Sequence, residues 1–195
     1  MCFVEEIEDF KPLTVFVPEV TQTVEETKIT TVATRATADH VVFIAHVPYS
    51  GELGIELLLN DQDSNPVYTQ AVTTNVEAGL IAIQIPMAIA QTFTVGEVHR
   101  WYFQIDCGNQ GSIHDYVEGD LVIVEPPSTA APVTVDQVRN YAQAGIWLDT
   151  LYLSQQLRAD AQGQEIWRGL LEQFGFAEFV DEPLRQQVLL PPASL

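Results

Sequence analysis

The stretch Glu125–Pro132, which reads EPPSTAAP, separates two parts of the sequence that differ in hydrophobic periodicity. Its prolines exclude a helix interior or a central strand, because proline lacks a backbone N–H group. Upstream, short β-branched runs alternate with turn residues, whereas downstream the apolar residues recur at helical spacing. The sequence therefore predicts a β domain over residues 1–125, a linker over residues 126–133 and a helical region over residues 134–195.

Seven strands are predicted upstream of the linker. The clearest, Arg100–Cys107, alternates with a period of two, so its apolar residues share one face that we expect in the core. Short strands separated by turns are typical of an antiparallel, immunoglobulin-like β-sandwich. The Thr-rich segment 21–38 is either a loop or an edge strand. The predicted strands are Leu13–Val17, Val41–Val47, Gly54–Asn60, Val67–Thr73, Leu80–Ile85, Val98–Asp106 and Tyr116–Val124.

Three helices are predicted downstream of the linker. The first begins after Thr134, a suitable N-cap, and ends before Gly145, and the others cover about residues 146–159 and 164–174. Helices this short cannot each bury an apolar face alone. We therefore expect them to pack on the sandwich or on a partner, which makes the fold class mainly β with an α appendage.

Composition and charge exclude several functions. Of 195 residues 27 are acidic and eight basic, which gives a net charge of −19, while 47% are hydrophobic. The chain is too apolar for a disordered acidic tail, and it has too few Lys and Arg residues for a nucleic-acid binder. Residues 1–126 carry a net charge of −15. Such a field either keeps an apolar protein soluble or attracts a cationic partner.

The termini and apolar runs bear on the compartment. No run is long and apolar enough to predict a transmembrane helix. The acidic residues Glu5, Glu6, Glu8 and Asp9 stand where a signal peptide carries positive charge. Two alternatives follow: a cytoplasmic protein, or an exported one whose leader has been removed.

Motifs for chemistry are missing from the sequence. None of the four histidines stands in an HxH or HExxH motif, and CxxC, GxSxG and phosphate-loop motifs do not occur. We therefore predict neither a cofactor nor an enzyme. A hydrolase with a carboxylate pair assembled in space stays open, with Asp106, Asp115 and Glu118 around one predicted loop.

One loop has the spacing of a calcium site. Asp61, Asp63 and Asn65 offer three oxygen ligands, yet Pro66 stands where an EF-hand loop needs glycine. The same residue types are ordinary in a hairpin turn. The two alternatives are a turn and a weak Ca²⁺ site.

These observations lead to three functional hypotheses. The first is a non-enzymatic binding or structural module that docks a protein partner or a second copy through its C-terminal helices, with Phe174, Phe176 and Phe179 as the candidate surface. The second is a Ca²⁺- or glycan-binding extracytoplasmic domain. The third is the carboxylate-dependent hydrolase.

Several stretches resemble a mostly cyanobacterial family called domain of unknown function 928. The most specific are Arg100–Phe103 with Cys107, and the segment 141–151, which reads YAQAGIWLDTL. The resemblance covers about residues 12–185 and implies no activity. Its other parts are Val47–Tyr49, Val67–Tyr68, Gly79–Ile81, Ile85–Pro86, Val117–Gly119, Leu157–Arg158, Trp167 and Leu170–Leu171.

The resemblance bears on the two cysteines. By themselves, Cys2 and Cys107 are either a disulfide or a terminal thiol and a buried one. Members of the family usually look exported and carry a cysteine upstream of the first strand, which Cys2 matches loosely. The resemblance therefore implies a Cys2–Cys107 disulfide and an extracytoplasmic location.

Overall fold

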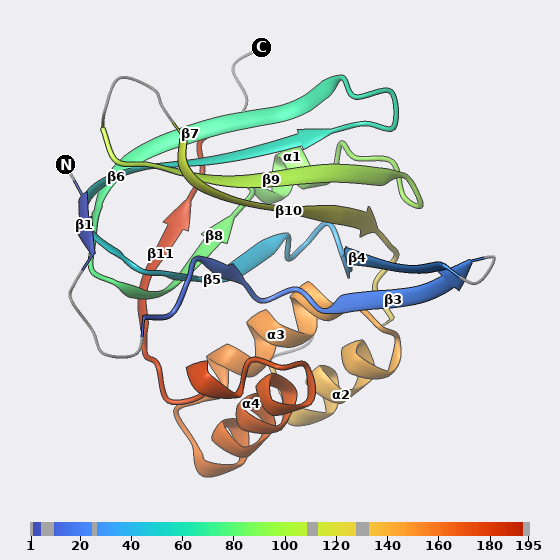
Figure 1. The fold of residues 1–195 in the computed structure, drawn as a ribbon. Coiled ribbons are helices and arrows are strands. Elements are labelled where there is room, and N and C mark those ends of the chain that lie inside the picture. Colours follow the sequence, from blue (N-terminus) through green and yellow to red (C-terminus); the bar gives the residue numbers. More distant parts are fainter. Residues whose placement is uncertain (1, 5–9, 25–26, 109–112, 128–132, 193–195) are drawn as a thin grey trace.

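The chain forms two β-sheets and a layer of helices (Figure 1). The computed structural model describes residues 2–4, 10–24, 27–108, 113–127 and 133–192, and for residues 2–4, 20–31, 113 and 114 it describes the backbone alone. The large sheet has the order β1-β6-β9-β10-β4-β3, with β7 beside β6. Its strands are β1 (Cys2–Val4), β3 (Glu19–Val24), β4 (Thr27–Ala36), β6 (Tyr49–Asn60), β7 (Pro66–Val76), β9 (Val98–Asp106) and β10 (Ile113–Ile123).

The small sheet lies between the large sheet and the three long helices (Figure 1). Its order is β11-β8-β5-β2, from β2 (Thr14–Val15), β5 (Val42–Val47), β8 (Gly79–Gln84) and β11 (Leu184–Leu189). The helices are α1 (Met87–Ala90), α2 (Val135–Gln143), α3 (Trp147–Gln156), α4 (Ala161–Gln173) and the 3₁₀ turn η1 (Ala177–Phe179). The mainly β fold class is confirmed, and each of the seven predicted strand segments contains a strand.

The expectation of a purely antiparallel arrangement is wrong. Strand β4 pairs with β10 in parallel, and β11 pairs with β8 in parallel. Parallel partners need long connections, and the chain between β8 and β11 contains two strands and all the long helices. Sequence periodicity does not reveal which distant strands become neighbours.

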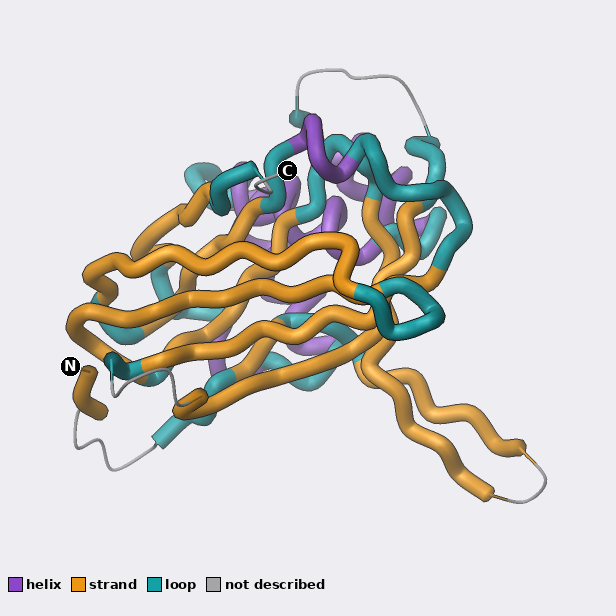
Figure 2. Tube along the Cα trace, turned by 90° about the horizontal axis from the view of Figure 1, so that it is seen from above, coloured by secondary structure: helices purple, strands orange, loops and turns teal. Residues whose placement is uncertain are grey.

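The helical region also ends earlier than predicted, because β11 returns to the small sheet. Of its six residues only Val188 is buried, so the segment lacks the apolar alternation that predicts a strand. The Thr-rich segment is not a loop: it belongs to the hairpin of β3 and β4, in which β3 is an edge strand of the large sheet among the described residues. Figure 2 shows this hairpin projecting from the body of the molecule.

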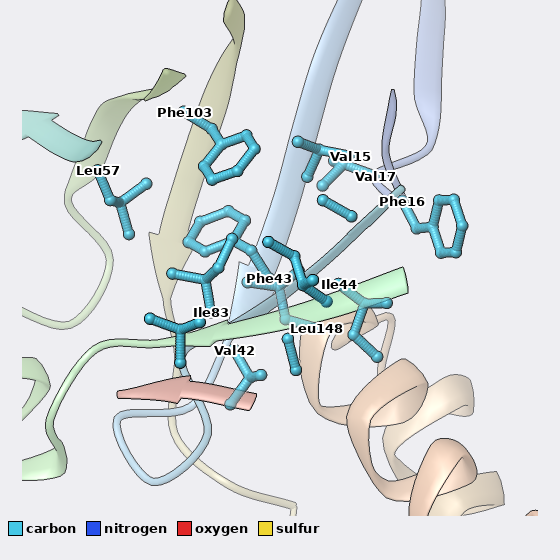
Figure 3. Packing of buried hydrophobic residues seen from close by; sticks show 14 of the residues in the cluster. Val15, Phe16, Val17, Val42, Phe43, Ile44, Leu57, Ile83, Phe103 and Leu148 are labelled. Atoms are coloured by element: carbon cyan, nitrogen blue, oxygen red, sulfur yellow. The ribbon is translucent and has the colours of Figure 1, made fainter. Parts of the chain in front are cut away.

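Strand β5 carries the core, because all six of its residues are buried. Phe43 faces the large sheet, where its ring centroid lies 5.1 Å from that of Trp101 on β9. On the helix side, His46 lies 4.9 Å from Phe179 by the same measure. Figure 3 shows residues of both sheets and Leu148 of α3 around this core. The small sheet is therefore covered on both faces.

Trp101 also explains why residue 119 is glycine. A Cβ atom at Gly119 would lie 2.7 Å from the Trp101 ring and 2.8 Å from the carbonyl oxygen of Val32. No rotamer change relieves a clash with backbone, so this position on β10 has no room for a side chain.

Two polar contacts fasten the helical layer to the sheets. The indole Nε1 of Trp147 donates a hydrogen bond to the carbonyl oxygen of Phe16 (2.6 Å). The fully buried carboxylate of Asp149 accepts from the backbone N–H (2.8 Å) and the hydroxyl (2.6 Å) of Thr37, and lies 3.0 Å from Nδ1 of His40. Both residues belong to the first turn of α3, so this turn anchors the layer.

We expect Asp149→Ala to lower the free energy of unfolding by about 3 kcal/mol or more, because it strands the buried polar groups of Thr37 and removes the partner of His40. Asp136→Ala is the matched control, since it makes the same change in the first turn of α2 at a side chain that is 88% exposed. It should cost about 0.5 kcal/mol or less. Urea unfolding of both variants measures the difference, and equal losses would contradict the anchoring role of Asp149.

Candidate functional site

A groove opens between the two sheets on the side of β2. On the opposite side, side chains join the sheets: the Tyr68 hydroxyl donates to the carbonyl oxygen of Pro191 (3.0 Å), and Gln186 Nε2 donates to the Thr74 hydroxyl (3.1 Å). The groove has a volume of about 520 Å³. It is lined by Leu13, Thr14, Val15, Val17, Pro18, Glu19, Val32, Val117, Gln173, Phe174, Gly175 and Phe176.

The walls of the groove are mostly apolar. Val15 and Val17 come from the small-sheet side, Val32 and Val117 from the large sheet, and Phe176 from the segment after α4. Strand β2 is the last strand of the small sheet among the described residues, and it pairs with β5 on one side only. The groove therefore offers apolar surface beside this short strand, whose Val15 carbonyl oxygen already accepts from the N–H of Val17 (2.8 Å).

Phe174 stands between this groove and a second hollow. The hollow has a volume of about 230 Å³, and Pro18, Gln173 and Phe174 line both spaces. The Phe174 ring lies 4.3 Å from the Trp147 ring, centroid to centroid, and the side chain is 36% exposed. The two spaces therefore lie next to each other, with Phe174 between them.

The three predicted interface phenylalanines have different places. Phe174 is exposed and Phe176 is half-buried in the groove wall. Phe179 is 1% exposed and packs against Phe16, with ring centroids 5.1 Å apart. The prediction that Phe179 is part of an exposed interface is therefore wrong. Its buried ring instead fastens the end of the helical region to the small sheet. Helical spacing alone does not tell an intramolecular contact from an external one.

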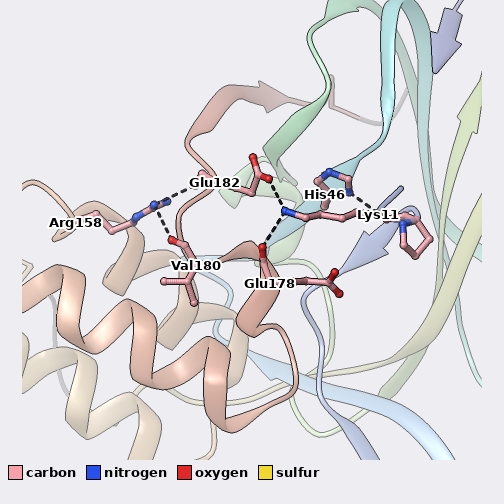
Figure 4. A network of polar contacts seen from close by, with 7 residues as sticks. Lys11, His46, Arg158, Glu178, Val180 and Glu182 are labelled. Carbon is pink, nitrogen blue, oxygen red and sulfur yellow. Dashed lines mark hydrogen bonds and ion pairs between the residues drawn. The ribbon is translucent and has the colours of Figure 1, made fainter. Parts of the chain in front are cut away.

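A polar network that the sequence analysis missed holds the segment after α4 (Figure 4). Lys11 Nζ donates to the carbonyl oxygen of Glu178 (2.9 Å) and to Oε1 of Glu182 (2.6 Å). From α3's end, Arg158 Nη2 donates to the carbonyl oxygens of Val180 (3.2 Å) and Glu182 (3.0 Å). These contacts bring together residues far apart in sequence, so no motif announces them. They hold residues 178–182, the segment that follows Phe176.

Two histidines are buried near these elements. Nδ1 of His46 lies 3.1 Å from the carbonyl oxygen of Pro12, and burial lowers the pKa of this imidazole against the opposing charges of Glu182 and Glu178. Burial also lowers the pKa of His99, whose two ring nitrogens have no hydrogen-bond partner in the described part of the protein. The fold therefore favours the neutral form of both side chains.

The candidate calcium loop is the turn between β6 and β7. The Asp61 carboxylate accepts from the backbone N–H groups of Asp63 (2.9 Å) and Asn65 (2.8 Å) and from the Asn65 amide. These bonds, first of all the one from the Asn65 side chain, lower the pKa of Asp61. The Asp61 carboxylate therefore closes the hairpin turn, as expected for the first of the two alternatives, a turn rather than a Ca²⁺ site. Among the described residues no group of three His, Cys, Asp or Glu side chains could hold a metal ion.

The three carboxylates proposed for a hydrolase have separate partners. Asp106 accepts from the backbone N–H of Gly108 (2.9 Å), Asp115 accepts from the Tyr49 hydroxyl (3.1 Å), and Glu118 pairs with Arg100 (2.9 Å). Burial and the bond to Asp115 raise the pKa of Tyr49 to about 12. The described contacts do not bring these acids together as an acid–base pair.

The backbone brings the two cysteine positions to one side of β6. Cys2 on β1 is opposite Gly51 of β6, and Gly51 also pairs with Val76 of β7, so β1 lies on the side of β6 that β7 leaves to β9. On that side Asp106, next to Cys107, is opposite Gly54. Cys107 is 7% exposed. The side chain of Cys2 lies outside the described residues, so the Cys2–Cys107 disulfide stays a prediction.

None of the described helices has the length and apolar character needed to cross a membrane.

The buried histidines predict acid sensitivity. Because the pKa of His46 is lower in the folded than in the unfolded protein, the unfolded chain binds its proton first as the pH falls below about 6.5. Stability is therefore complete above that pH and declines below it. We expect His46→Gln, which cannot be protonated, to make unfolding free energy depend less steeply on pH between about 5 and 7. An unchanged slope would show that His46 is not a source of the acid sensitivity.

The shared side of β6 predicts that the two cysteines are oxidised. We expect the intact mass to rise by two hydrogen atoms on reduction, and Cys107→Ala to lower the free energy of unfolding by roughly 2–4 kcal/mol in oxidising buffer. Under reducing conditions the loss should shrink to that of a small buried side chain. A mass that reduction leaves unchanged would contradict the pairing.

Comparison with known proteins places the chain in a family. The model of one family, described as Domain of Unknown Function (DUF928), matches residues 5–184. This range includes most of both sheets and all three long helices. No curated protein matches the chain. The resemblance seen in the Arg100–Phe103 strand and in the helix pair is therefore confirmed: this chain belongs to the DUF928 family.

Proposed function

We propose that this protein is a non-enzymatic binding module, a β-sandwich platform whose groove beside Phe174 holds an extended apolar segment of a partner protein. The observation that carries the proposal is the apolar groove of about 520 Å³ beside β2 and Phe174. An extended peptide directs alternate side chains to one side, where apolar ones can enter such a groove.

The groove walls are held before any partner arrives. Trp147 is tied to Phe16 at one end, and Lys11 and Arg158 hold the segment that follows Phe176 at the other. A preformed site avoids the entropic cost of ordering its walls on binding. This rigidity supports a role in binding.

Charge narrows the chemistry of the partner. The chain carries a net charge of −19, and Glu19 stands in the groove lining. Such a field attracts a segment with basic flanks and repels an acidic one. The occupant we propose is therefore an extended run of alternating apolar residues between lysines or arginines.

Synthetic peptides test this proposal. The probe is a fluorescent peptide of alternating valine and threonine with two lysines at each end, and its controls carry glutamates at the ends or a central proline. We expect the lysine-flanked peptide alone to bind, and Phe174→Glu to weaken it at least tenfold, about 1.4 kcal/mol. The added carboxylate would itself attract lysines, so a loss has to come from the apolar contact.

The matched control is Leu189→Glu, which makes the same change of charge at a 62% exposed residue of β11, the other edge strand of the small sheet. It should leave the affinity unchanged. Thermal unfolding checks that both variants fold. Equal affinities for the three peptides, or equal effects of the two substitutions, would refute the groove as a peptide site.

A further inference from the structure

The hairpin of β3 and β4, residues Glu19–Ala36, forms an arm with open edges. Its strands pair with each other from Glu19 opposite Val32 to Val24 opposite Thr27. Strand β10 joins β4 only at Ala33–Ala36. Beyond that point no further strand flanks the arm in the described part of the chain, and Figure 2 shows the arm standing away from the body.

An arm of this kind has low stability by itself and exposes unpaired backbone groups. A two-stranded hairpin without a third strand is marginally stable in water. Unpaired N–H and C=O groups on its edges invite another strand, and proteins usually block such edges with proline, bulges or charge. The arm contains no proline, its pairing has no register shift, and ten of its 18 residues are Val, Ile or Thr. This composition has a high β propensity and therefore favours pairing of the open edge with another strand.

Charge makes the arm the favourable place for two copies to meet. The arm has three acidic and two basic residues, a net charge of −1, in a chain of −19. Within β3 the only charged residue is Glu19, at the base of the arm. Two copies repel each other through their bodies, and this repulsion is smallest where their arms touch.

The sequence of β3 is also self-complementary. Residues 20–24 read VTQTV, which is the same in both directions about Gln22. When two such strands pair in antiparallel register centred on Gln22, Val20 stands opposite Val24 of the second copy and Thr21 opposite Thr23 of the second copy. Like β-branched residues then meet as cross-strand pairs, and the two Gln22 positions stand opposite each other at the two-fold axis. A two-fold contact requires this self-complementarity.

We propose that two copies of this chain associate through the β3 edges of their arms, in antiparallel register centred on Gln22, and so form a four-stranded sheet between the two bodies. The contact is separate from the peptide groove. Substitutions at Gln22 should therefore leave binding of the lysine-flanked peptide unchanged, so the two proposals succeed or fail independently.

Sedimentation tests the association. At about 100 μM we expect the wild-type chain to sediment as a dimer, with an affinity that rises when salt screens the body-to-body repulsion. Gln22→Lys and Gln22→Glu should each weaken the dimer at least tenfold, because they place like charges opposite each other. Gln22→Lys does so although it reduces the net negative charge.

Mixing the two variants supplies the decisive measurement. Gln22→Lys and Gln22→Glu together should restore a dimer that contains one copy of each, since opposite charges then meet at the two-fold axis. The same pair of substitutions at Gln70, on the edge strand β7, should leave the wild-type dimer unchanged. A monomeric wild-type chain, variants at Gln22 that remain dimeric, or a mixture that stays monomeric would each overturn the proposal.

Discussion

The structure depends on the double burial of β5. All six residues of this strand are buried, so neither face can remain in water. The large sheet covers one face, where Phe43 meets Trp101, and the helical layer covers the other, where His46 meets Phe179. A continuous apolar strand is stable only when both covers are present. We therefore expect the β part and the helical part to unfold together, although the linker between them looks like a domain boundary.

This constraint also produces the groove. The helical layer reaches the sheets through the first turn of α3, where Trp147 and Asp149 hydrogen-bond to the backbone of Phe16 and Thr37. The end of α4 then lies beside β2, and on the opposite side hydrogen bonds from Tyr68 and Gln186 join the two sheets. The buried donors at both anchors, the indole N–H of Trp147 and the backbone N–H of Thr37, each have an acceptor, so their burial leaves no hydrogen bond unmade. What stays open is the apolar groove beside Phe174.

The acidic side chains act in two ways, through local hydrogen bonds and through the net charge of the chain. Carboxylates that looked like candidate ligands or catalysts are used locally: Asp61 closes a turn, Glu118 pairs with Arg100, and Asp115 accepts from Tyr49. Residue types at a suitable spacing do not tell whether their oxygens converge or turn toward their own loop. The net charge nevertheless acts at long range. It favours basic partners at the groove and leaves the weakly charged arm as the place where two copies repel each other least.

Local periodicity determined the element types. The alternation in Arg100–Cys107 predicted β9, and the helical spacing after Thr134 predicted α2, because side-chain direction follows directly from backbone period. The pattern of β11 was too weak to predict, since only Val188 is buried there. Tertiary structure alone decided the parallel pairs, the burial of Phe179 and the network around Lys11, which join residues distant in sequence. Such contacts depend on how the whole chain closes over β5, and no single segment carries that information.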